Sequence, residues 1–400
     1  MFETAGALVA FSSAANAGIT VPAGDWTLDF GGNVNAYYTH TNYSGAGVSA
    51  TNGVSGADVS RNQISTGLLP AASGIGGKTR QNELDIAFQF TFFTGTSSGS
   101  QLASVLPGLQ GAAANGAGGG NTLNSRQAYM TFGDASWGTV TMGRNLGVFG
   151  SDAILSDMTL LGVGGNAGAS GSSTLGRIGS GYMYADWIGQ IAYTTPNWNG
   201  FQATVAATQP WDNKAVTGGD TSNSNIGWQG KVTYDFAAND VTGRVWASAI
   251  YQKHDANVAN GVLGYDSTGF DVGAKAAYQG AELVGYYYNG DGLAGPQDGA
   301  TGLLFLQGNE SKDSGGYVQA TFKVPGVGTK IGASWGESLS TQKTGGNEFK
   351  NEAWIVGAYH PLTKSLNLVA EYTDNKYENL YGGTDQMKAK TVSLGAILFF

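Results

Sequence analysis

The sequence of 400 residues contains no cysteine. Disulfide frameworks, thiol nucleophiles and cysteine-ligated zinc sites are therefore excluded. Charged residues are also scarce, at 12% of the chain against about 25% in ordinary globular domains. The formal net charge of −9 argues against a nucleic-acid partner, because binding to phosphates needs clustered lysine and arginine.

Long apolar runs are absent as well. No run of about 18 apolar residues occurs, so the sequence predicts no membrane-spanning helix. A membrane protein without such helices must be a closed β-barrel, because lipid offers backbone groups no hydrogen-bond partners. Glycine, at 65 residues, and aromatic residues, at 11%, are abundant instead. Glycine lets strands bend at barrel corners, and aromatic side chains suit the two membrane–water interfaces.

Apolar and polar residues alternate along much of the chain. From Trp26 to Tyr38 most even positions are apolar, while odd positions such as Asp29 and Asn33 are polar. The same period of two recurs in residues 226–236, 270–278 and 366–372. This pattern predicts strands with one apolar and one polar face. A soluble sandwich of two sheets has the same alternation, so this signal alone leaves two architectures open.

The lengths of the connections separate the two architectures. Short turns such as Gln279-Gly280 alternate with long polar links such as 289–314, and outer-membrane barrels have this asymmetry. We therefore predict an all-β fold for residues 18–400, a transmembrane antiparallel β-barrel of about sixteen strands. In this count the third strand begins at Lys78. A barrel of this size encloses water, and both termini fall on the side of the short turns.

The N-terminus has features of an export signal. Ala5–Ala14 is a short apolar run, and Ala15-Asn16-Ala17 matches the small-residue cleavage pattern of a secretory signal peptide. Residues 1–17 are therefore a predicted signal peptide. The first four residues, Met-Phe-Glu-Thr, lack the usual basic side chain, so a mature N-terminal arm is the alternative.

The last strand carries an alternating apolar face that ends on a C-terminal aromatic residue. This face comprises Val392, Leu394, Ala396, Leu398 and Phe400. It is similar to the C-terminal assembly signal of outer-membrane barrels, and the resemblance implies recognition by the barrel assembly machinery. An ordinary closing strand is the alternative.

Residues 125–144 resemble the general bacterial porins. Arg126-Gln127-Ala128-Tyr129 matches the Arg-x-Ala-aromatic strand of that family, and a tight turn then leads to a strand that ends in Gly143-Arg144. Residues 145–153, Ser156-Asp157-Met158 and 176–179 are also similar to those porins. Residues 62–70, which end in Thr-Gly-Leu-Leu-Pro, look closer to a Gram-negative porin subgroup that includes DcaP-like porins. The motif match covers about 125–200, and the similarity elsewhere is one of architecture.

The resemblance implies that residues from about 145 to 180 form a third loop that folds into the barrel and narrows it. The length of this link agrees, because long links in compact domains are usually functional. The link also holds apolar residues suited to packing against an inner wall: Leu155, Met158, Leu160, Leu161 and Val163. A lid or a disordered insertion is the alternative.

The same resemblance implies a pore constriction. Arg126 and Arg177 match positions where the family places basic wall residues, and Asp157 and Asp152 match the acidic side of the inserted loop. Arg144 either contributes to the constriction or anchors the base of the loop. Opposed charges across a narrow, water-filled gap would orient dipolar solutes and sort ions by sign.

Alternation alone points further charged residues toward the lumen. Lys231, Arg244 and Lys275 face it, either for selectivity or as solvated lining. Asn33 occupies a position where the general porins often carry lysine, which puts strong anion selectivity in doubt. The acidic positions that also face inward, and that leave the sign of selectivity open, are Asp29, Asp271 and Glu371.

No catalytic or metal-binding pattern competes with a channel. The histidines, His40, His254 and His360, lack metal-ligand spacing. Nucleophile, zinc-protease and phosphate-loop motifs are missing. The run 289–292 lacks the spaced carboxylates of a calcium site. We therefore expect no enzyme activity, cofactor or metal.

Together these features predict a porin in the outer membrane of a Gram-negative bacterium, open to passive diffusion of small hydrophilic solutes and ions. The family resemblance implies a homotrimer, surrounded by lipid and lipopolysaccharide. Two alternatives stay open: a substrate-selective channel for small organic acids or sugars, and a surface adhesin in which the barrel is an anchor.

Overall fold

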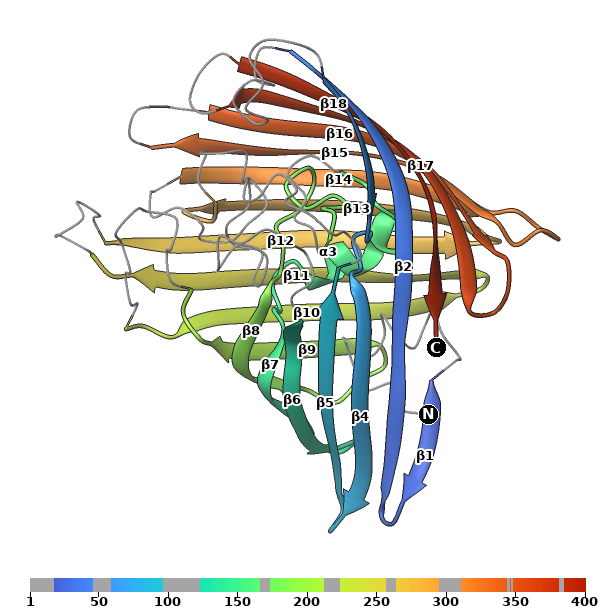
Figure 1. Ribbon diagram of the computed structural model, residues 1–400. Coiled ribbons are helices and arrows are strands. Elements are labelled where there is room, and N and C mark those ends of the chain that lie inside the picture. Colours follow the sequence, from blue (N-terminus) through green and yellow to red (C-terminus); the bar gives the residue numbers. More distant parts are fainter. Residues whose placement is uncertain are drawn as a thin grey trace.

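The structure is a computed structural model that describes residues 18–45, 59–95, 123–165, 173–211, 224–256, 264–294, 311–343, 346, 348–380 and 385–400. Eighteen strands form one antiparallel sheet (Figure 1). They are β1 (Ile19–Ala23), β2 (Trp26–Ser44), β3 (Val59–Ser65), β4 (Ala71–Gln81), β5 (Leu84–Thr94), β6 (Asn124–Asp134), β7 (Gly138–Leu146), β8 (Trp187–Thr194), β9 (Phe201–Thr208), β10 (Gly227–Ala238), β11 (Val241–His254), β12 (Tyr265–Tyr278), β13 (Ala281–Asp291), β14 (Ser311–Lys323), β15 (Lys330–Gln342), β16 (Glu348–Pro361), β17 (Leu366–Leu380) and β18 (Asp385–Phe399).

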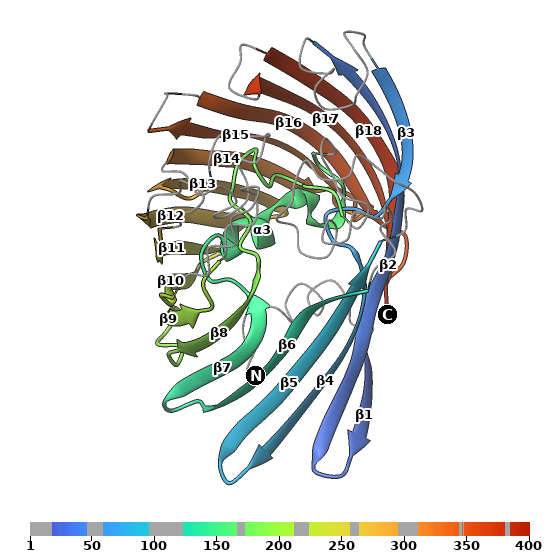
Figure 2. The same ribbon diagram turned by 60° about the vertical axis from the view of Figure 1, so that its left-hand side comes forward.

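Two short helices follow β7: α3 (Ser151–Ser156) and the 3-10 helix η1 (Met158–Leu161). Among the described residues, no helix has the length and apolar character needed to cross a membrane. Figure 2 shows α3 within the curve of the strands.

The sheet closes on itself through composite strands. β18 pairs with residues 33–44 of β2, and β1 continues along the same edge by pairing with residues 26–30. On the other edge of β2, β3 and β4 follow one another in the same way. The eighteen segments therefore make the sixteen crossings of a closed antiparallel barrel, which confirms the predicted strand number.

The two faces of the barrel differ as the alternation predicts. Val34 on β2 is 55% exposed and Trp228 on β10 is 52% exposed, whereas their neighbours Asn33 and Gln229 are 0% and 3% exposed. Large apolar side chains exposed around a whole sheet would be unstable in water, but they match lipid. The apolar side chains therefore form the outer surface.

One strand boundary in the sequence analysis is wrong. The third crossing begins at Leu84 rather than at Lys78, which lies within β4. The turn between β4 and β5 is made by Asn82 and Glu83, both with positive φ, at 48° and 66°. Hairpin turns of this kind usually contain glycine. Without that glycine, the turn has no clear sequence signal.

The lipid-facing surface yields a stability prediction. Val272 lies on the outer face of β12 and is 46% exposed. Val272→Lys should lower the free energy of unfolding in lipid vesicles by about 2–4 kcal/mol, because a charge then faces hydrocarbon. Urea titration of the folded fraction measures the change. Thr242→Lys on the inner face of β11 is the matched control, and an equal loss in both variants would contradict the assignment of faces.

Candidate functional site

The described parts of the link between β7 and β8, residues 147–165 and 173–186, lie against the polar face of the barrel wall, and together we call them the segment. Its first turn is held by the side chain of Gln229 on β10, whose Oε1 accepts hydrogen bonds from the backbone N–H groups of Val148 and Phe149, both at 2.7 Å. Further along, Gln319 on β14 accepts a hydrogen bond from the N–H of Met158 at 2.7 Å. Side chains of the wall thus replace the ladder partners that an irregular backbone lacks.

Two buried carboxylates anchor the segment in the same way. Asp271 on β12 accepts a hydrogen bond from the N–H of Gly150 at 3.0 Å. Glu371 on β17 accepts hydrogen bonds from the N–H groups of Val163 and Gly164, both at 2.8 Å. Alternation predicts that both carboxylates face inward, but their function as anchors for the backbone became visible only in the structure.

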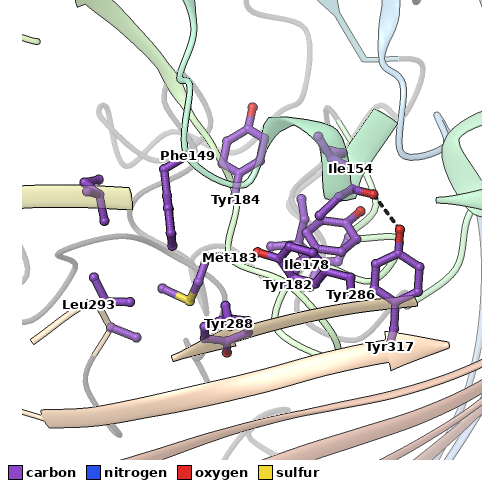
Figure 3. Close-up of a cluster of buried hydrophobic side chains, with 14 of the residues drawn as sticks. Phe149, Ile154, Ile178, Tyr182, Met183, Tyr184, Tyr286, Tyr288, Leu293 and Tyr317 are labelled. Atoms are coloured by element: carbon purple, nitrogen blue, oxygen red, sulfur yellow. Dashed lines mark hydrogen bonds between the residues drawn. The ribbon is translucent and has the colours of Figure 1, made fainter. Parts of the chain in front are cut away.

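An aromatic cluster fixes the first half and the end of the segment (Figure 3). Tyr182 packs edge-on against Tyr317 of β14, with ring centroids 5.9 Å apart. The hydroxyl of Tyr317 donates a hydrogen bond to the carbonyl of Ala153 at 2.8 Å. Phe149 and Met183, both 0% exposed, belong to the same cluster. Burial of these side chains supplies the hydrophobic driving force that docks the segment.

A charged group forms where α3 meets the wall. The carboxylate of Asp152 lies 2.6 Å from Nζ of Lys231 on β10 and 3.1 Å from Nη1 of Arg244 on β11. Arg244 also binds Asp235, with Nε and Oδ1 2.6 Å apart. Burial raises the pKa of Asp152, but the charges of Lys231 and Arg244 outweigh burial and hold the pKa below its ordinary value of 3.8. The structure therefore brings together three of the residues that the sequence analysis selects.

Asp157 and Arg177 do not face each other across an opening. The Oδ1 atom of Asp157 caps η1 through the N–H of Thr159 at 2.9 Å. Its Oδ2 atom accepts hydrogen bonds from the hydroxyl of Tyr182 at 2.8 Å and from the backbone N–H of Arg177 at 3.2 Å. The side chain of Arg177 is 0% exposed, and its guanidinium binds Ser334 and the carbonyl of Ala353. The expected opposed pair is thus replaced by two buried residues that shape the segment.

The remaining arginines and Asn33 also have defined positions. Arg126 is 7% exposed, and its guanidinium carbon lies 4.9 Å from the centre of the Phe93 ring. Arg144 of β7 pairs with Ala128 of β6, so the two side chains lie on the same face of the sheet. Its Nε atom donates a hydrogen bond to the carbonyl of Trp187 at 3.2 Å. Met130, the next residue on that face of β6, is 50% exposed on the outer side. Arg144 therefore anchors a strand end rather than lining the lumen, because register places it on the outer face.

Asn33 and Lys275 lie on the inner face. Asn33 is 0% exposed and accepts a hydrogen bond from the side chain of Asn35 at 2.7 Å. Lys275 lies opposite Arg244 in the pairing of β11 with β12. Lys78 on β4 was not selected from the sequence, yet it is an exposed inner-face cation. Its signal was the alternation of β4, which the misplaced strand boundary concealed.

The three histidines make ordinary polar contacts. His40 binds Asn62 at 2.8 Å, His254 binds Ser267 at 2.9 Å, and His360 binds Thr329 at 2.9 Å. Within the described ranges, no group of three or more histidine and acidic side chains is placed to hold a metal ion.

Comparisons with known proteins agree with this architecture. The family model described as "Gram-negative porin" matches residues 4–380. No curated protein sequence matches the chain significantly.

Several solved structures share the fold. The outer-membrane channel DcaP of Acinetobacter baumannii is 16% identical, with a TM-score of 0.64 and coverage of 95% of this chain and 99% of that one. An anion-selective porin from Comamonas acidovorans is also 16% identical, with a TM-score of 0.61 and coverage of 94% and 100%. Salmonella typhi OmpF is 16% identical, with a TM-score of 0.58 and the same coverage. At these identities the likeness shows the fold alone.

The charged group at α3 yields a prediction on docking. Asp152→Asn removes two ion pairs, and hydrogen bonds to charged groups contribute about 1.5–3 kcal/mol each. A cysteine placed at Ala153, which is 0% exposed, should then react with a thiol reagent at least about tenfold faster. With Asp152 intact, this protection should persist at pH values above 3.8, because the pKa of Asp152 lies below that value, and should weaken as the pH falls through the lowered pKa.

Asp235→Asn is the matched control for this experiment. It removes a partner of Arg244 but leaves both pairs of Asp152 in place. Equal reactivity at position 153 in the two variants would show that Asp152 does not hold α3.

Proposed function

This chain belongs to the Gram-negative porin family and forms an outer-membrane channel for passive diffusion, and we propose that solutes cross it between the segment and the inner face of β4 and β5. The segment then acts as the constriction. Two observations support this route. Inner-facing side chains differ in their exposed fraction from one part of the wall to another, and the segment lies along only part of the wall.

The proposal rests on which inner-facing side chains of the wall the segment covers. Residues beneath the segment are buried: Gln229 is 3%, Asp271 1% and Glu371 4% exposed. On β4 and β5, the inner-facing Lys78 is exposed and Gln89 is partly exposed, whereas Thr91 and Phe93 further along β5 are 1% and 2% exposed. Since the contacts of the segment run along the wall from β10 to β17, the exposed part of the inner face at Lys78 and Gln89 supports a passage on the side of β4 and β5.

Two glycines on β4 leave room for a lining side chain on the neighbouring strand. Gly74 and Gly76 occupy inner positions of β4, opposite Thr91 and Gln89 on β5. A Cβ atom on Gly76 would lie 2.5 Å from Oε1 of Gln89. The absence of side chains at these glycines leaves Gln89 space on the wall, which supports its assignment as a lining residue.

The charges near this route come from both sides. Lys78 and the pair of Arg80 with Asp85, 2.8 Å apart, lie on the wall. We propose that these residues set the ion preference together with Lys231 and Arg244 beside α3. In this proposal Arg126, Asp157 and Arg177 do not contact solutes. They contribute to the electric field in the passage only from buried positions.

We further propose that the chain works as a homotrimer without enzyme activity. A Vibrio cholerae outer-membrane protein described in a trimer form has a similar fold, with 14% identity and a TM-score of 0.52. Of the five residues of the proposed assembly signal, four are 42–52% exposed on the outer face: Val392, Leu394, Leu398 and Phe400. This exposure supports contact with lipid and with the assembly machinery.

The route through the barrel is testable because the chain has no native cysteine. Gln89→Cys should react with a charged thiol reagent in planar bilayers and reduce the single-channel conductance. In a trimer the reduction should occur in three equal steps. Ser338→Cys, at a wall position that is 0% exposed beneath the segment, is the control and should not react. Modification of position 89 without any block would refute the proposed route.

Lys78 provides a test of ion preference. Lys78→Gln removes a positive charge from the proposed passage, so the reversal potential under a salt gradient should shift toward cation selectivity. Lys390→Gln is the control, because Lys390 lies on the lipid-facing side of β18 with its Nζ 3.8 Å from Asp374. An equal shift of the reversal potential in both variants, or a shift in neither, would refute the assignment of Lys78 to the passage.

A further inference from the structure

The second crossing of the barrel contains an inward break. Tyr37 of β2 pairs with Ser65 at the end of β3, and Asn33 pairs with Ala72 near the start of β4. Residues 34–36 of β2 thus lie opposite residues 66–71, so the second crossing has surplus chain at this point. We call residues 66–70 the wall clamp, for the contacts described next.

The side chain of Asn35 holds the wall clamp in shape. Its Oδ1 atom accepts a hydrogen bond from the N–H of Gly67 at 2.9 Å, and its Nδ2 atom donates one to the carbonyl of Leu69 at 2.9 Å. Asn35 itself is 2% exposed. A buried amide that bonds both a donor and an acceptor of the broken strand replaces the lost ladder hydrogen bonds. The break is therefore a stabilised feature of the wall.

The wall clamp binds the middle of the segment through its main chain. The N–H of Leu68 donates to the carbonyl of Gly162 at 2.8 Å, and the N–H of Thr174 donates to the carbonyl of Gly67 at 3.0 Å. The side chain of Leu68, 6% exposed, packs in the same cluster as Leu175 of the segment. Wall and segment are thus joined by both polar and apolar contacts.

Two glycines make this close approach possible. A Cβ atom on Gly67 would lie 2.1 Å from the carbonyl oxygen of Gly162 and 2.7 Å from the ring of Tyr37. A Cβ atom on Gly162 would lie 2.0 Å from Oε1 of Glu371. Real Cβ atoms essentially never approach this closely, so a side chain at position 67 would displace the backbone of the segment, and one at position 162 would displace the carboxylate of Glu371. The glycines therefore determine how near the segment lies to the wall.

We propose that the wall clamp positions the middle of the segment, at Gly162 and Thr174, and thereby determines the width of the passage. This inference rests on the proposed function, because it assigns the clamp to the same constriction. Leu68 and Gly67 are positioning residues: they act through the segment rather than by contact with a solute. The motif that ends in Leu69-Pro70 is thereby given a physical role.

The test uses two clamp variants and two independent readouts. Leu68→Ala removes apolar packing without adding bulk, and Gly67→Ala introduces the clash. The first readout is the thiol reactivity of Val163→Cys, whose position is 0% exposed. Reactivity should rise at least about tenfold in both clamp variants, because loss of buried packing favours local opening. The second readout is the size limit for neutral sugars in liposome swelling, which should change in both variants.

Gly285→Ala is the matched control, since a Cβ atom there meets nothing within 4 Å. It should leave both readouts at wild-type values. Unchanged thiol reactivity in folded clamp variants would overturn the clamp, and raised reactivity with an unchanged size limit would overturn its control of the passage. If the wild-type protein fails to conduct at all, the proposed route fails, while the thiol readout still reports on the clamp.

Discussion

The whole structure depends on one constraint: backbone N–H and C=O groups need hydrogen-bond partners where water is absent. In the wall, β18 and β1 meet this need by sharing one edge of β2, and β3 and β4 share the other. Closure leaves no free edge, so the outer surface can be apolar. The exposed side chains of Val34 and Val272 then contact lipid rather than a protein core.

The same constraint governs the interior. The described residues of the segment have little regular structure, and the wall supplies partners for their backbone through Gln229, Asp271, Gln319 and Glu371. Polar residues on the inner face therefore have two different functions. Those beneath the segment bind its main chain and are buried, whereas others, such as Lys78 on β4, are exposed and line the passage that we propose. A count of inward charges does not distinguish these two groups.

Much of the fold was predictable because alternate residues of a barrel strand face lipid and the interior, so apolar and polar residues alternate along its sequence. Trp228 and Gln229 illustrate this on β10, and the alternation of short and long links set the number of crossings. The prediction failed where a local signal was missing. The turn at Asn82 and Glu83 contains no glycine, and the break after Ser65 depends on contacts with Gly162, which is distant in sequence.

What the sequence determined by itself was the class of protein: a closed barrel, apolar outside and polar inside, with a long segment between β7 and β8. Only the tertiary structure decided which charges meet. Asp152 joins Lys231 and Arg244, while Asp157 bonds within the segment and the buried guanidinium of Arg177 binds β15 and β16 of the wall. The reason is physical. Alternation defines the face of each side chain, but strand register and the path of the segment decide its neighbours.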